Sequence, residues 1–251
     1  MRENLIVTSD NSDQAALRGI AWLVQTAATT SEDGLIAVNG FAVLDRVAGR
    51  LLGTAGAKHL RAGTGTINGV RVKTMSDARP LFDFAGPVLA LFPSAKLLDR
   101  LDNMYSITHL LVIPWMEKDA KDWVRAWNPR ELGEEPQEEA IAEIASPVVQ
   151  TAMNDLLLMI NTSTGIVHPS DKQTAIEIFR CLKLNGVTYD PDEIRAWLVG
   201  ARDLDPADAN DIRDLANKIL EGRTVQGAGP ARKDTRRFKM WTEKVGKPSQ
   251  P

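Results

Sequence analysis

Cysteine is almost absent from this sequence, and its scarcity excludes several classes of protein. Cys181 is the single cysteine, so the chain can form no internal disulfide and cannot assemble a cysteine-based zinc cage by itself. We therefore expect a reducing, cytoplasmic environment. Cys181 lies between Phe179 and Leu182 in a helical pattern, which favours a buried, unreactive thiol over a nucleophile.

Long apolar runs are also missing. No stretch reaches the roughly 18 consecutive apolar residues of a membrane span. The first residues, MRENLIVTSDNSDQ, turn polar too early for an ordinary secretory signal. We therefore expect no membrane partner.

The common catalytic and cofactor motifs do not occur. The histidines stand at 59, 109 and 168 and form neither an HExxH motif nor a close metal-binding pair. The glycines of GTGTING are spaced one residue too far apart for a dinucleotide fingerprint, and a strand-like segment follows them instead of a helix. No GxSxG nucleophile elbow is present. We predict no metal site and no cofactor, and these motifs leave open whether the chain is an enzyme.

Charge is unevenly distributed along the chain. The formal net charge is -3, yet residues 222 to 251 carry eight Lys or Arg against two acidic residues. The body of the chain is therefore acidic, and a basic surface that could bind nucleic acid is expected only at the end of the chain.

What the sequence does contain, in its first half, is an alternation of apolar strands and amphipathic helices. Short apolar segments begin at residues 5, 35, 87 and 109, and helical patterns separate them. Strands that are apolar along their whole length need cover on both faces, which parallel sheets with crossover helices provide. The pattern predicts an α/β fold over residues 1–132, with a three-layer, Rossmann-like, mostly parallel sheet.

A hairpin is predicted within this first domain. Asn68 and Gly69 separate two alternating segments, and this dipeptide tolerates the positive φ that both positions of a tight hairpin turn require. We expect the hairpin as an insertion in the α/β domain.

The second half lacks strand signals. An acidic linker is predicted over 133–140, a smaller all-α helical bundle over 141–222, and a flexible basic tail over 223–251. Helix starts are predicted at Ser170, with Gln173 completing a capping box, and at Asp190 and Asp205, each followed by proline.

If the first domain is an open α/β sheet, ligands are expected at the carboxyl ends of its strands, near a reversal of strand order. The candidate crevice residues are Asp10, Asn11, Asn39, Ser94 and Trp115. A helix N-cap explains Asp10 and Ser94 without any function.

The basic tail is the second candidate site. Its cations could displace counterions from nucleic acid while an aromatic ring stacks on a base. The candidate nucleic-acid residues are Arg232, Lys233, Arg236, Arg237, Phe238, Lys239 and Trp241. The same tail could instead fold back on the acidic body of the chain.

Another aromatic pair lies within the first domain. Trp123 and Trp127 stand one helical turn apart. We expect them to pack their helix against the sheet or against the second domain.

Three hypotheses of function follow. The leading one is a cytoplasmic binding or regulatory protein, in which the α/β domain holds a small ligand or an interaction face and the helical domain contacts a protein partner or a second copy of the chain. One alternative is a hydrolase or transferase acting at the crevice, with Asp10, Asn39 and Ser94 as its candidate residues. The other is a nucleic-acid-associated protein that uses the basic aromatic tail.

Overall fold

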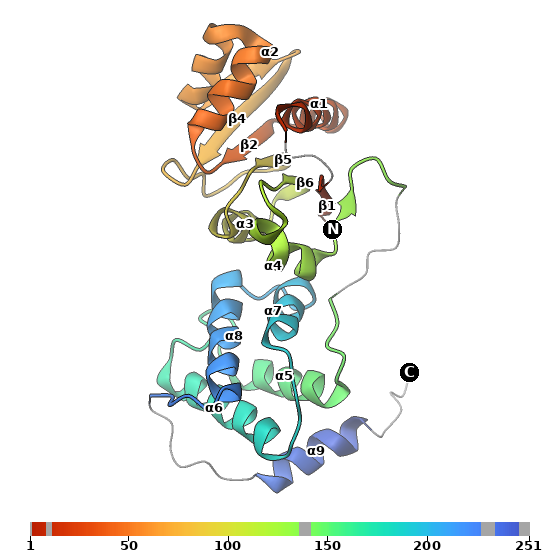
Figure 1. The fold of residues 1–251 in the computed structure, drawn as a ribbon, viewed down its shortest axis with the longest axis vertical. Helices are drawn as coiled ribbons and strands as arrows, with labels where there is room; N and C mark the ends of the chain where they lie inside the picture. Colours follow the sequence, from red (N-terminus) through yellow and green to blue (C-terminus); the bar gives the residue numbers. More distant parts are fainter. Residues whose placement is uncertain (1, 9–11, 136–141, 227–233, 246–251) are drawn as a thin grey trace. The chain divides into compact units, whose positions relative to one another are not determined.

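The chain folds into two compact units, Met1–Ala140 and Ile141–Pro251. We describe them from a computed structural model, which covers residues 2–8, 12–135, 142–226 and 234–245. Figure 1 shows a sheet flanked by helices in the first unit and helices alone in the second. Asp10, Asn11, Arg232 and Lys233, all named above as candidates, lie outside the described residues.

The first unit is an α/β domain, as predicted. Its seven strands form one sheet in the order β3-β4-β2-β5-β6-β1-β7. All neighbouring strands are parallel except β3 and β4. The strands are β1 (Glu3–Ile6), β2 (Gly34–Val38), β3 (Thr64–Ile67), β4 (Val70–Ser76), β5 (Gly86–Leu91), β6 (Ile107–Ile113) and β7 (Arg130–Glu131).

The predicted hairpin joins β3 to β4. Asn68 and Gly69 form its turn, with φ of 48° and 83°. Positive φ at both positions matches the twist of the flanking strands. The hairpin therefore adds an antiparallel edge strand to an otherwise parallel sheet.

Helices cover both faces of the sheet, which makes three layers. Alternate residues of β2 point to opposite faces, so that Ile36 joins one apolar cluster and Leu35 the other. The cluster around Ile36 contains α1 (Asp13–Thr30) and α2 (Phe41–Ala62). The cluster around Leu35 contains α3 (Ala95–Asp102) and α4 (Glu117–Trp127).

The paired tryptophans of α4 share one carboxylate. The Asp102 side chain is nearly buried and accepts hydrogen bonds from the indole Nε1 of Trp123, at 3.2 Å, and of Trp127, at 3.0 Å. Arg2 donates to the same carboxylate at 2.7 Å and lies over the Trp127 ring. Burial raises the pKa of Asp102, and the Arg2 charge and these hydrogen bonds oppose that rise. The pair therefore packs α4 onto its own domain, through Asp102 of α3 and Arg2, which precedes β1.

The second unit contains five described helices and, over its described residues, no strand. They are α5 (Pro147–Met159), α6 (Pro169–Leu184), α7 (Pro191–Gly200), α8 (Pro206–Leu220) and α9 (Thr235–Val245). Asp190 and Asp205 cap α7 and α8, as predicted, each accepting from the backbone amide two residues ahead. A residue that accepts from the free amides of the first turn fixes where a helix begins.

The start of α6 differs from the prediction. Its N-cap is His168, whose ring accepts from the Ser170 amide at 3.3 Å, and the helix begins at Pro169. Proline presets the φ of a first helical residue, so the helix starts before Ser170 and the predicted capping box with Gln173 does not form there.

The flexible tail expected over 223–251 is a helix at residues 235–245. This helix, α9, packs against α5 and α6. Trp241 is completely buried, and its indole donates to the buried Asp155 of α5 at 3.1 Å. The burial of one aromatic ring and its hydrogen bond outweigh the flexibility that the basic composition of the segment suggests.

Among the described residues, the structure has no helix that combines the length and the apolar character needed to span a membrane.

Candidate functional site

The carboxyl ends of four neighbouring parallel strands meet at one edge of the α/β sheet. Val38 of β2 is level with Leu91 of β5, which is level with Ile113 of β6, and β1 lies beside β6. The residues that follow these strands therefore share this edge, which we call the carboxyl edge. It comprises Thr8, Asn39, Phe92, Ser94, Trp115 and Met116 among the described residues.

The direction in which the chain crosses over between strands reverses at two points along this edge. The helices that follow β1 and β2 cover one face of the sheet, whereas those that follow β5 and β6 cover the other. The direction of the crossover therefore changes between β2 and β5 and again between β6 and β1. Open α/β sheets bind their ligands at such points.

Asn39 spans the reversal between β2 and β5. Its carboxamide nitrogen donates to the backbone oxygen of Phe92 at 2.8 Å, and its oxygen accepts from the Ser94 amide, also at 2.8 Å. The structure thus brings Asn39 and Ser94 together, with both ends of the Asn39 amide engaged by backbone. The observed role of Asn39 is to join the ends of two strands.

Ser94 caps the helix that follows β5. Its hydroxyl accepts from the Leu97 amide at 3.2 Å, at the first turn of α3. This is the role that a serine before a helix usually has, and it is the alternative to a ligand-binding role that the sequence offers for Ser94.

Trp115 presents an aromatic surface at the same edge. The side chain is 49% exposed, and the adjacent Met116 is 47% exposed. The Trp115 ring meets the buried Phe92 ring edge to face, with centroids 5.2 Å apart. Such a contact orients an aromatic ring while leaving part of it accessible.

Phe92 is the residue that sequence reasoning missed. It connects Asn39, through its backbone oxygen, with Trp115, through its ring. Its φ is 50°, a left-handed conformation that is uncommon for a bulky residue. Strained backbone of this kind concentrates at functional sites. The one sequence signal for this position is the Phe92-Pro93 dipeptide after an apolar strand, because a proline restricts the backbone of the residue before it.

A carboxylate lies at the end of β1. Glu131 of β7 accepts from the Thr8 amide at 3.1 Å and from the Thr8 hydroxyl at 3.0 Å. Asp10 and Asn11, which we predicted as crevice residues, follow Thr8 but lie outside the described residues. In the described part of the chain, no three or more His, Cys, Asp or Glu side chains lie together in a group that could hold a metal ion.

The tail candidates separate into two groups on α9. Trp241 is buried, and Phe238 is half-buried, so Trp241 presents no ring on which a base could stack. Arg236 and Lys239 are exposed, and Arg237 is half-buried. Trp241 thus faces the core of the helical unit, whereas Arg236 and Lys239 face solvent.

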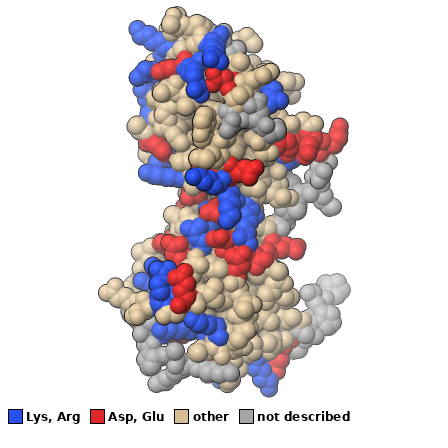
Figure 2. All heavy atoms as spheres, in the orientation of Figure 1, with Lys and Arg blue, Asp and Glu red and all other residues tan. Residues whose placement is uncertain are grey.

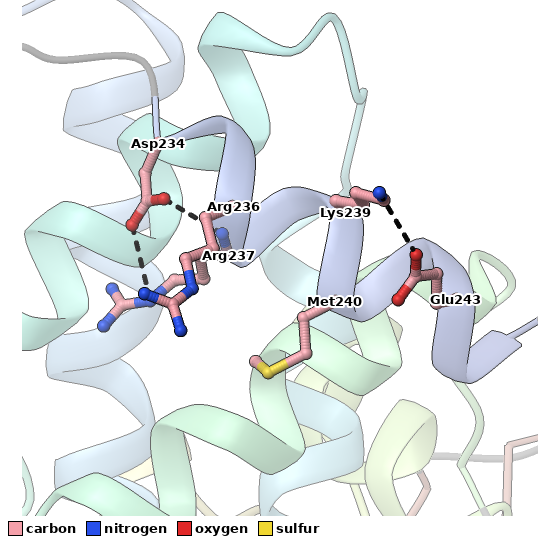
Figure 3. Close-up of a pocket in the computed structure, with 6 residues that line it drawn as sticks. All are labelled: Asp234, Arg236, Arg237, Lys239, Met240 and Glu243. Atoms are coloured by element: carbon pink, nitrogen blue, oxygen red, sulfur yellow. Dashed lines mark hydrogen bonds and ion pairs between the residues drawn. The ribbon is translucent and has the colours of Figure 1, made fainter.

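An open hollow of about 530 Å³ follows the outer side of α9. Figure 3 shows the side chains that line it, with those of Arg236 and Arg237 pointing the same way and Met240 beside them. The complete lining is Asp234, Arg236, Arg237, Lys239, Met240 and Glu243. The ion pairs there are loose: Arg237 lies 3.9 Å from Asp234, and Lys239 lies 3.6 Å from Glu243.

A family comparison bears on the helical unit. Residues 145–242 match the model of a family described as a domain of unknown function, DUF1889. The match includes α5 to α8 and ends one residue beyond Trp241, so α9 up to that tryptophan belongs to the matched segment.

A solved structure is also similar to part of the chain. It is a crystal structure of a protein from Salmonella typhimurium, with 22% identity over 40% of this chain and 97% of that one, at a TM-score of 0.32. Among curated proteins, no sequence matches this chain.

Proposed function

We propose that this chain is a cytoplasmic binding protein whose α/β unit holds a small ligand at the carboxyl edge of its sheet. The observation that carries the proposal is a difference between the polar and the apolar residues at that edge. Asn39 and Ser94 are engaged with backbone groups, while Trp115 and Met116 remain about half exposed. Apolar and aromatic surface beside a few fixed polar groups is typical of a binding site.

This arrangement supports binding more than the hydrolase or transferase alternative. For Asn39 to reach a substrate, its amide would have to give up two backbone hydrogen bonds of 2.8 Å. Ser94 would act as a nucleophile only with a base beside its hydroxyl, and the contact of that hydroxyl in the structure is with the Leu97 amide, which is a donor and no base. The enzyme alternative therefore depends on Asp10, outside the described residues.

The expected ligand has a planar ring. Trp115 is held edge to face on Phe92, so its accessible surface can stack on an aromatic ring of the ligand, which is worth about 1–3 kcal/mol. The strand ends at the two reversals would supply backbone donors and acceptors beside it. Mononucleotides, nucleosides and aromatic acids share this chemistry.

A thermal-shift screen of the full chain tests the proposal. The panel holds those three compound classes and divalent cations, and a compound that binds the folded state raises the unfolding temperature. A ligand at a hundredfold excess over its Kd stabilises by about 2.7 kcal/mol. We expect the Trp115→Ala variant to lose most of that shift.

The matched control is Phe82→Ala in the same unit. Phe82 is 88% exposed and lies in the loop before β5, at the amino end of that strand, so its removal should leave the shift intact. The proposal would be contradicted if a ligand still raised the unfolding temperature of Trp115→Ala, or if Phe82→Ala lost that rise equally. Either result would mean that the ligand binds elsewhere.

A further inference from the structure

Helix α9 has one side that belongs to the core and one that faces solvent. Trp241 on the inner side is buried against Asp155, and the Cys181 thiol donates to the backbone oxygen of Asp234, which precedes the helix, at 3.3 Å. The outer side carries the hollow described above. Because the inner contacts hold α9 in place, its outer side is a fixed surface.

The cations of this surface are weakly engaged. The nearest carboxylate atoms to Arg237, on Glu177 and Asp234, are both 3.9 Å away, and the Lys239 pair with Glu243 joins two exposed side chains. The exposed Lys239–Glu243 pair contributes little to stability, and 3.9 Å is too long for a hydrogen bond from the Arg237 guanidinium. An incoming carboxylate can therefore replace them, and a guanidinium binds a carboxylate with two parallel hydrogen bonds.

Methionine supplies the apolar part of the surface. Met240 lines the hollow and is 38% exposed. Arg237 also contacts the sulfur of Met159 at the end of α5, at 4.0 Å, and Met159 is 47% exposed. Methionine is flexible and polarisable, and it recurs on surfaces that adapt to a partner's side chains.

The same residues argue for a protein partner and against nucleic acid. Asp234 and Glu243 line the hollow together with the cations, so the cations do not form the continuous run that successive backbone phosphates engage, whereas a single side-chain carboxylate needs only one guanidinium. The Trp241 ring, which a base could otherwise stack on, is buried. On the face drawn in Figure 2, basic and acidic side chains are interspersed and form no continuous basic surface.

We propose that the outer side of α9 binds an acidic segment of another protein. A carboxylate of that segment pairs with Arg236 or Arg237, and an apolar side chain of the segment packs on Met240. This site lies in the helical unit and does not depend on the ligand proposed for the carboxyl edge of the α/β unit.

The test uses short fluorescent peptides and the full chain. One peptide is rich in Asp and Glu and has a single central leucine, a second has serine in place of the leucine, and a third replaces every acidic residue by its amide. Fluorescence anisotropy measures binding to the unmodified protein and to three variants. They are Arg236→Glu, Met240→Ser and, as a control for net charge, Lys58→Glu on an exposed position of α2.

The leucine peptide should bind in a salt-sensitive manner, and the amide peptide should not bind. Arg236→Glu should weaken the leucine peptide about tenfold. The leucine peptide should bind the unmodified protein more tightly than the serine peptide, and Met240→Ser should abolish this difference in affinity. Lys58→Glu should change the affinity for the leucine peptide by less than about twofold. Circular dichroism checks that each variant remains folded.

Three results would overturn the proposal. One is that no acidic peptide binds more tightly than its amide counterpart, and another is that Lys58→Glu weakens binding as much as Arg236→Glu. The third is that a single-stranded oligonucleotide binds more tightly than the peptide and loses its affinity in Arg236→Glu, which would assign the surface to nucleic acid.

Discussion

The indole nitrogen of Trp241 donates a 3.1 Å hydrogen bond to the carboxylate of Asp155, and both side chains are buried. This contact joins residues 86 positions apart and attaches α9 to α5. The Lys244 ammonium lies 3.8 Å from the same carboxylate. The pair makes α9 a part of the helical unit, and it holds the outer surface of α9 in place.

We predict that Trp241→Ala destabilises the helical unit by about 3–5 kcal/mol, because it leaves a large cavity in the core. Trp241→Phe should cost about 1–3 kcal/mol, since it keeps an aromatic ring in the core but removes the indole donor and leaves Asp155 under-satisfied. Urea unfolding measures both. Met240→Ala on the outer side of the same helix is the control and should change stability by less than about 0.5 kcal/mol. Equal effects of Trp241→Ala and Met240→Ala would mean that α9 is not docked.

A second prediction uses the only cysteine as a reporter. Cys181 is buried, and burial raises the pKa of its thiol above the usual 9.0, which lowers its reactivity at neutral pH. The native thiol should react slowly with a disulfide reagent. Trp241→Ala should accelerate the reaction at least about tenfold, because undocking α9 uncovers Cys181. An unchanged rate would show that α9 does not protect this thiol.

Asn39 should stabilise the carboxyl edge. Replacing it by alanine removes both hydrogen bonds between the ends of β2 and β5, and we expect a loss of about 1–2 kcal/mol in urea unfolding. Asn39→Asp keeps the acceptor for Ser94 but places a second oxygen against the Phe92 carbonyl. That variant should therefore be least stable near neutral pH and recover partly in acid, where a protonated carboxyl can donate. An Asn39→Asp protein as stable as the unmodified one at neutral pH would contradict this role.

The buried Asp102 gives a dependence of stability on pH. Its pKa is raised above the usual 3.8 by burial, which outweighs the opposing Arg2 and indole contacts. A raised pKa in the folded state means that the contribution of this group to stability is complete below about pH 4 and is lost as the pH rises through the folded pKa.

Asp102→Asn removes this titration. The unfolding free energy of the variant, relative to that of the unmodified protein, should therefore increase as the pH rises from about 4 toward neutrality. Urea unfolding across that range measures it. A shift in favour of the unmodified protein would mean that Arg2 and the indoles outweigh burial.

The features that sequence reasoning predicted well have local causes. The turn at Asn68 and Gly69, the caps at Asp190 and Asp205, and the buried strand that contains Ile36 each depend on a few neighbouring residues. Such signals are visible in any short window of sequence.

Helix α9 was missed because its main contact is remote. A signal was nevertheless present: Asp234 stands at a capping position, and Phe238 and Trp241 follow at helical spacing. The basic residues around them dominated the composition and suggested a flexible tail. Only the fold places Asp155 opposite Trp241.

The carboxyl edge was predicted in part. Strand ends identified Asn39, Ser94 and Trp115 as neighbours of an expected crevice, and the structure places all three at that edge. The engagement of Asn39 with backbone and the bridging position of Phe92 depend on strand order. Strand order is a long-range property that no local pattern encodes.

The most direct test of the proposed binding function is a titration followed through the indole N–H signals of the six tryptophans by NMR. Each signal is assigned by a single Trp→Phe variant, and each stabilising compound from the thermal-shift panel is titrated in turn. We predict that the Trp115 signal moves most, while the signals of the buried, hydrogen-bonded Trp123 and Trp241 stay in place. A compound that stabilises the protein and leaves the Trp115 signal unmoved would contradict binding at the carboxyl edge.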